Sequence, residues 1–115
     1  MNKFNAISSG GYRSKAENLH SLWLRSEIRA KRIVQFKYEV SYDLFAWTSQ
    51  LGKSEKVFIG KHKPDFTVEF PNGCIEVHEV KGGNATKTEA WNLRKKIFEA
   101  NYPHILYKVF DKFRY

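Results

Sequence analysis

Apolar residues recur every three to four positions between Ser14 and Ile33, which is the spacing of one buried face of an α-helix. Ser14 followed by Glu17 has the spacing of a capping box, in which the serine side chain accepts a hydrogen bond from an unpaired N–H of the first turn. The pattern therefore predicts a helix from Ser14 to about Ile33, with basic residues on its outer side.

A second helix is predicted from about Lys87 to Asn101, where Trp, Ile and Phe residues supply the apolar contacts. Thr86 and Glu89 repeat the capping-box spacing at its start. Tyr102-Pro103 ends it, because proline cannot continue a helix. Gly82-Gly83 is expected to end the preceding strand.

Apolar and polar side chains alternate strictly over Phe36–Leu44, which predicts one half-buried β-strand. The polar segment Ala46–Glu55 is expected to be a loop, and Lys56–Ile59 is expected to be a short strand. A last strand is predicted at Ile105–Phe110.

Two further strands are predicted at Asp65–Phe70 and Cys74–Lys81, joined by the turn Pro71-Asn72-Gly73. The order helix, three or four strands, helix, strand predicts the α/β (α+β) class, with a mixed central sheet of four to five strands flanked by helices. We expect one domain over residues 14–115, preceded by a flexible polar arm at residues 1–13.

The length of the hairpin turn decides which side chains share a face of the sheet. If Phe70 pairs with Cys74 around a three-residue loop, Asp65 lies directly opposite Glu79. A two-residue loop would turn Asp65 to the other face, because a slip of one residue inverts every side chain. Pro71 is consistent with the longer loop, since proline has no N–H to donate to a strand ladder.

The balance of charges favours a polyanionic partner. The chain of 115 residues holds 20 Lys and Arg against 12 Asp and Glu, a formal net charge of +8. Nucleic acid is the first candidate, because phosphate contacts supply most nonspecific binding.

Cys74 is the one cysteine, and no apolar run is long enough to span a bilayer. A soluble cytoplasmic protein without a membrane partner is therefore expected.

Asp65, Glu79 and Lys81 are the candidate chemical group. Glu79 and Lys81 are two positions apart in one predicted strand, so their side chains leave the same face. Two facing carboxylates repel each other unless a positive charge intervenes. Mg²⁺ is the expected cofactor, with Mn²⁺ as a substitute, because it prefers oxygen ligands and bridges to phosphate. Lys81 would then orient or deprotonate a water, or stabilise charge on the phosphate.

Pro64-Asp65, followed on the next strand by Glu79-Val80-Lys81, resembles the motif of the PD-(D/E)XK nuclease superfamily. The resemblance covers about residues 14–110 and is strongest to small phage-encoded endonucleases, including junction-resolving ones. It implies a restriction-endonuclease-like sheet, metal binding by Asp65, Glu79 and the Val80 carbonyl, and catalysis by Lys81. It also implies an acid from the first helix. Glu17 occupies that place, although its capping role explains it equally well.

The expected function is therefore a metal-dependent DNA endonuclease, selective for branched DNA or Holliday junctions. A homodimer is expected, because cutting both strands needs two copies. A phage-encoded enzyme would act in the cytoplasm of a bacterial host. Two alternatives stay open: a nicking or site-specific endonuclease of the same superfamily, and a non-catalytic basic DNA-binding module.

Most other polar and aromatic residues have a structural explanation. His78 is expected to be structural or solvated rather than a metal ligand. The aromatic residues are expected mainly in the core and not as base-stacking platforms, because they fall at strand and helix periods. The basic residues expected to contact DNA are Lys15, Lys61, Lys63, Arg94 and Lys95.

Overall fold

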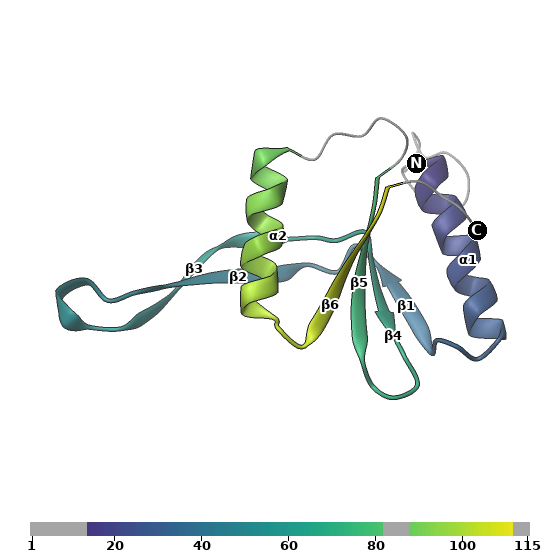
Figure 1. Cartoon of the computed structure of the whole chain (residues 1–115), viewed down its shortest axis with the longest axis horizontal. Helices are drawn as coiled ribbons and strands as arrows, with labels where there is room; N and C mark the ends of the chain where they lie inside the picture. The colour runs from purple at the N-terminus through teal and green to yellow at the C-terminus, as the bar shows by residue number, and fades with distance from the viewer. Residues whose placement is uncertain (1–13, 82–87, 112–115) are drawn as a thin grey trace, which may run out of the picture.

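A four-stranded mixed sheet is flanked by two helices, and a separate two-stranded hairpin extends away from them (Figure 1). The computed structural model describes residues 14–81 and 88–111, so the expected flexible arm at residues 1–13 lies outside the described part. The expected mixed α/β class is confirmed. The elements, in chain order, are α1 (Lys15–Arg29), β1 (Gln35–Tyr38), β2 (Tyr42–Thr48), the 3₁₀ helix η1 (Gln50–Gly52), β3 (Glu55–His62), β4 (Phe66–Glu69), β5 (Ile75–Val80), α2 (Glu89–Asn101) and β6 (Ile105–Phe110).

The larger sheet has the order β1-β4-β5-β6, in which β5 and β6 are parallel and the other pairs are antiparallel. Alternate residues of β5 pack on its two faces. Val80 joins Phe66 and Leu24 of α1 in one buried cluster. Val77 joins Phe98 of α2 in the other. Each helix therefore buries one face of the sheet, which is the physical reason the layers hold together.

In the described ranges, no helix has both the length and the apolar character needed to cross a membrane.

The first helix begins where expected and ends earlier. Ser14 caps it by accepting a hydrogen bond from the N–H of Glu17 at 3.1 Å. The helix stops at Arg29 instead of Ile33, and Lys31 has a left-handed φ of 64°. Ile33 is still buried in the cluster with Leu24, so its apolar character reflects core packing outside the helix.

The prediction of one strand over residues 36–44 was wrong. Glu39 has a φ of 56°, which turns the chain, and its N–H donates to the carbonyl of Asp65 at 2.9 Å. The segment before this turn is β1, which pairs with β4. The segment after it is β2, which pairs with β3 in a different sheet. Alternation continues on both sides of Glu39, so the pattern alone could not show the break.

The β2–β3 hairpin, called the arm below, is longer than the sequence suggested. The expected loop at residues 46–55 is strand as far as Thr48, and the expected strand at residues 56–59 runs from Glu55 to His62. Cross-strand pairing accounts for the difference, because polar residues are tolerated on strands that are exposed on both faces. At the tip, Leu51 and Gly52 adopt positive φ angles of 57° and 76° and reverse the chain. Figure 1 shows the arm reaching well beyond the helices.

The second helix starts later than expected and ends where expected. Its cap is Thr88, whose hydroxyl accepts from the N–H of Trp91 at 3.1 Å, rather than Thr86. Thr86 and Gly82-Gly83 lie outside the described residues. The helix ends at Asn101, and β6 follows at Ile105–Phe110, as predicted.

Candidate functional site

The turn between β4 and β5 has the three-residue form on which the site prediction depends. The N–H of Phe70 donates to the carbonyl of Cys74 at 2.9 Å, and the N–H of Gly73 donates to that of Phe70. The ladder runs to the pair Phe66 and His78. The next position of this register places Asp65 opposite Glu79, so both carboxylates belong to the same face.

Asp65 is held at the open end of this hairpin. Its carboxylate accepts a hydrogen bond from the backbone N–H of Val80 at 2.7 Å, and the residue is only 6% exposed. Burial, followed by the charge of Glu79, raises the pKa of Asp65 to about 7, against the lowering effect of the Val80 N–H. The carboxylate therefore lacks a positive charge sufficient to keep it ionised at its usual pH.

Glu79 has one paired and one unpaired oxygen. Its Oε2 lies 3.2 Å from Nζ of Lys81. Its Oε1 is buried and has no hydrogen-bond partner among residues 14–81 and 88–111. Burial raises the pKa of Glu79, and Lys81, followed by the nearby backbone N–H of Asp65, opposes this. A buried carboxylate oxygen without a partner is costly, and a cation is the ligand that would satisfy it.

Lys81 is fixed on two sides. Its ammonium pairs with Glu79 and also lies 4.4 Å from the ring centroid of Trp91 on α2. The aromatic face attracts the cation and restricts a side chain that would otherwise be mobile. The expected group of Asp65, Glu79 and Lys81 is therefore brought together in one place.

Glu17 reaches the same region from α1. It is buried, and its carboxylate accepts a 2.5 Å hydrogen bond from the hydroxyl of Tyr38. It is close enough that its charge raises the pKa of both Asp65 and Glu79. The helix cap uses the backbone N–H of Glu17, so the side chain is available for a separate role.

His62 and Tyr107 are site neighbours that the sequence reasoning missed. Their side chains share a buried hydrogen bond of 2.7 Å between Nε2 and Oη. Burial, then Arg94 and Lys81, lower the pKa of His62 to about 4. Burial, then Glu79, raise the pKa of Tyr107. No local pattern marks this pair, because His62 ends β3 and Tyr107 lies on β6, and only tertiary packing brings these strands of two different sheets together.

Two of the expected DNA-contacting residues lie around one groove. Lys61 of β3 and Arg94 of α2 line a groove of about 280 Å³ between the arm and α2, together with Leu44, Ile59, Gly60, Ala90, Leu93 and Ile97. Lys63 is exposed beside Pro64, and Lys15 is exposed on α1. Lys95 is engaged within the protein, since it pairs with Glu99 at 2.9 Å and lies over Tyr107.

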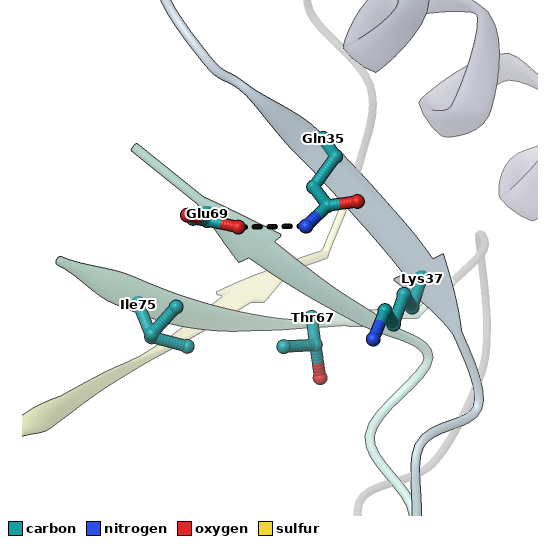
Figure 2. Close-up of a pocket in the computed structure, with 5 residues that line it drawn as sticks. All are labelled: Gln35, Lys37, Thr67, Glu69 and Ile75. Carbon is teal, nitrogen blue, oxygen red and sulfur yellow. Dashed lines mark hydrogen bonds between the residues drawn. The ribbon is translucent and has the colours of Figure 1, made fainter. Parts of the chain in front are cut away.

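A smaller hollow on the sheet belongs to a different place. Figure 2 shows its lining residues on β1, β4 and β5, with Gln35 donating to Glu69 at 2.7 Å. Its volume is about 100 Å³, and it is lined by Gln35, Lys37, Thr67, Glu69 and Ile75. None of the candidate acids lines it, so it is not a substrate pocket for this site.

His78 has a structural role on the opposite face of β5. It is buried, shares a 2.9 Å hydrogen bond with His20, and contacts the carboxylate of Glu76 at 2.9 Å. Burial lowers the pKa of both histidines. The pair therefore belongs to the core between the sheet and α1.

The oxygen donors of the site suit a hard divalent cation. In the described parts of the chain, no three His, Cys, Asp or Glu side chains are grouped closely enough to hold a metal by themselves. The set expected from the sequence has a different composition: the carboxylates of Asp65 and Glu79 with the main-chain carbonyl of Val80. Such a set leaves places for water and phosphate oxygens, as Mg²⁺ sites commonly do. The unpartnered Oε1 of Glu79 supports this assignment.

Comparison with known proteins gives a match over nearly the whole chain. A family model described as "Protein of unknown function (DUF1064)" matches residues 1–114. No curated protein and no solved structure matches. The chemistry of the site itself is therefore the basis for its proposed function.

Proposed function

We propose that this chain, which belongs to the DUF1064 family of proteins of unknown function, is a metal-dependent endonuclease that hydrolyses phosphodiester bonds in DNA. One observation carries the proposal: Asp65 and Glu79 are buried opposite each other, one oxygen of Glu79 has no partner among the described residues, and the ammonium of Lys81 lies 3.2 Å away. A structural ion pair accounts for Glu79 and Lys81 alone. It does not account for a second buried acid facing them.

Asp65 and Glu79, with the Val80 carbonyl, would hold one or two Mg²⁺ ions, and Mn²⁺ would replace them. A bound divalent cation would lower the pKa of water and neutralise charge on the phosphate. Burial of the two acids lowers the local dielectric and strengthens their attraction for a cation. Burial is also the main cause of their raised pKa values, to which Glu79 adds at Asp65 and which Lys81 opposes at both acids.

Lys81 would act on the reacting atoms directly. Its Nζ donates hydrogen bonds to the attacking water or to a non-bridging oxygen of the phosphate. The water oxygen bonds to phosphorus and gives up one proton to solvent, one bond from phosphorus to a sugar oxygen breaks, and that oxygen takes up a proton from solvent. Trp91 limits the positions that the ammonium can reach, which keeps it beside Glu79. Glu17 would supply a further acid from α1, positioned by Tyr38.

DNA is the proposed substrate because the whole chain carries a net charge of +8. Lys61 and Arg94 lie together around a groove and would contact its phosphates, with Lys63 and Lys15 as further exposed cations. We keep branched DNA and Holliday junctions as the favoured substrates, and a homodimer as the cutting unit. Both rest on the resemblance of the motif to junction-resolving nucleases.

The test is a cleavage panel of junction, flap, nicked, duplex and single-stranded DNA, run with Mg²⁺ and with EDTA. We expect Mg²⁺-dependent cleavage that falls about 100-fold or more in Lys81→Ala, the usual size of the loss when one hydrogen-bond donor to the transition state is removed. The affinity of Lys81→Ala for DNA, measured in EDTA, should change far less than its cleavage rate. Lys108→Ala is the matched control, because Lys108 pairs with Glu76 on the other face of the sheet. DNA binding without cleavage of any substrate would leave the non-catalytic module as the better explanation.

A further inference from the structure

The arm exposes a row of aromatic rings on one face. The rings of Phe45 and Phe58 lie across the two strands with centroids 6.2 Å apart. Trp47 is two residues after Phe45, so it shares that face, and it is paired in register with Lys56. Trp47 is 61% exposed and Phe58 is 53% exposed. The expectation that aromatic residues belong mainly to the core is therefore wrong for these two.

Lysines are interleaved with the rings. Nζ of Lys56 lies 4.2 Å from the centroid of Phe45, and Nζ of Lys61 lies 5.6 Å from that of Phe58. Lys61 also pairs with Asp43 at 2.7 Å. Each ammonium is held beside an aromatic ring by a cation–π contact. The surface therefore presents apolar rings and positive charges in alternation.

Lys61 is the residue shared by this row and the groove on the other face of the arm, where Leu44 packs against α2. Lys61 and Arg94 line the groove between the arm and α2. Arg94 and Lys81 both lie near enough to His62 to lower its pKa. Beyond His62, the chain itself leads from β3 into Asp65. Arg94, which lines the groove, and Lys81, which pairs with Glu79, therefore both lie near His62, the residue that follows Lys61.

We propose that the arm binds single-stranded nucleic acid, with bases stacked on Trp47 and Phe58 and phosphates contacting Lys56 and Lys61. Only an unpaired base presents its face to a ring, and stacking with lysine contacts is the general mode of single-strand binding. A second copy of the chain fits less well, because two such rows facing each other would bring like charges together. The inference builds on the proposed function and defines the substrate class as DNA with a single-stranded branch beside the cut.

Binding is measured in EDTA with a fluorescein-labelled thymidine oligonucleotide and, separately, with a duplex of the same length. We expect Trp47→Ala and Phe58→Ala each to weaken single-strand binding about 10-fold, the effect of losing one stacked base. Trp47→Phe should restore most of the affinity, because it keeps a ring. Leu22→Ala is the matched control: it removes a side chain that is 51% exposed on α1 and should leave affinity unchanged.

Lys56→Ala should lower the salt dependence of binding by about 0.7 in the slope of log K against log salt, the contribution of one phosphate contact on a single strand. Affinity within twofold of the parent for both ring variants overturns the proposal. Equal losses for duplex and single strand overturn it as well. A change of sedimentation from dimer to monomer with unchanged affinity would assign the arm to a second copy instead.

Because these measurements contain no metal, they are independent of the cleavage panel. A protein that binds through the arm and cuts nothing refutes the nuclease proposal alone. A protein that cuts with Mg²⁺ and binds single strands equally well without its exposed rings refutes the arm proposal alone.

Discussion

The carboxylate of Asp65 accepts a 2.7 Å hydrogen bond from the backbone N–H of Val80, across the open end of the β4–β5 hairpin. This bond fixes the acid beside Glu79, and it occupies one of the two oxygens of Asp65. The same side chain therefore has a structural and a proposed chemical role, and substitutions have to separate the two.

The variants Asp65→Ala and Asp65→Asn are expected to differ in their free energy of unfolding, although both should lose cleavage activity. The alanine variant leaves the buried N–H of Val80 without an acceptor, which costs about 1–3 kcal/mol. The asparagine variant keeps an acceptor and removes a charge that burial and Glu79 disfavour, so at pH 8 it should be at least as stable as the parent. Both should lose Mg²⁺-dependent cleavage. Urea denaturation gives the free energies of unfolding. Equal destabilisation by both variants would show that the hydrogen bond contributes little.

Metal binding should be visible as stabilisation without any substrate. Mg²⁺ or Mn²⁺ at about 100 times its dissociation constant should raise the free energy of unfolding by about 2.7 kcal/mol, and EDTA should reverse the effect. Glu79→Gln should abolish this response, because it weakens the proposed ligand set. Glu76→Gln is the control, since Glu76 lies on the same strand but contacts His78 and Lys108 instead. A metal response that persists in Glu79→Gln would contradict the assignment.

The contribution of His20 to stability should be lost as the pH falls below the pKa of an ordinary histidine. Burial and His78 lower the pKa of His20 from 6.5 to about 3. Above pH 6.5 the imidazole is neutral in both states. Between pH 6.5 and 3 the unfolded chain binds a proton that the folded protein does not, so the free energy of unfolding falls, by up to about 1.4 kcal/mol per pH unit for one group.

His20→Gln tests this dependence, because glutamine keeps a polar group beside His78 and does not titrate. Urea denaturation at pH 7.5, 6 and 5 should show a shallower loss of stability in this variant than in the parent. His104→Gln replaces an exposed histidine and should keep the parent's slope. Parallel curves for all three proteins would rule out His20 as the source.

The turn that sets the register depends on Gly73. Its φ of 89° lies in the left-handed region, which costs other residues about 1–2 kcal/mol. Gly73→Ala should therefore lower the free energy of unfolding by about that amount, although a new Cβ would meet no other atom within 4 Å. Gly73→Asn should cost less, because asparagine tolerates this conformation. Thermal unfolding of the two variants measures the difference. If Gly73→Ala and Gly73→Asn lower the free energy of unfolding by the same amount, the backbone angle is not the cause of the lost stability.

Local signals were sufficient for the start of α1, the end of α2, the last strand and the β4–β5 hairpin. Ser14 capped α1 and Pro103 followed the end of α2, because capping and the missing proline N–H act within one turn of helix. The odd-numbered turn around Asn72 also placed Asp65 opposite Glu79, since register follows from turn length once two strands pair. The central acids of the site were therefore accessible from the sequence.

The sequence by itself determined that Glu79 and Lys81 share a face of the sheet, and that Asp65 joins them if the turn between the strands holds three residues. Only the tertiary structure decided that the strand pattern breaks at Glu39, and that His62 meets Tyr107 beside the acids. The physical reason is the range of the interactions. Caps, turns and strand periods are fixed by residues a few positions apart, whereas the choice of strand partner is made by packing between segments far apart in the chain.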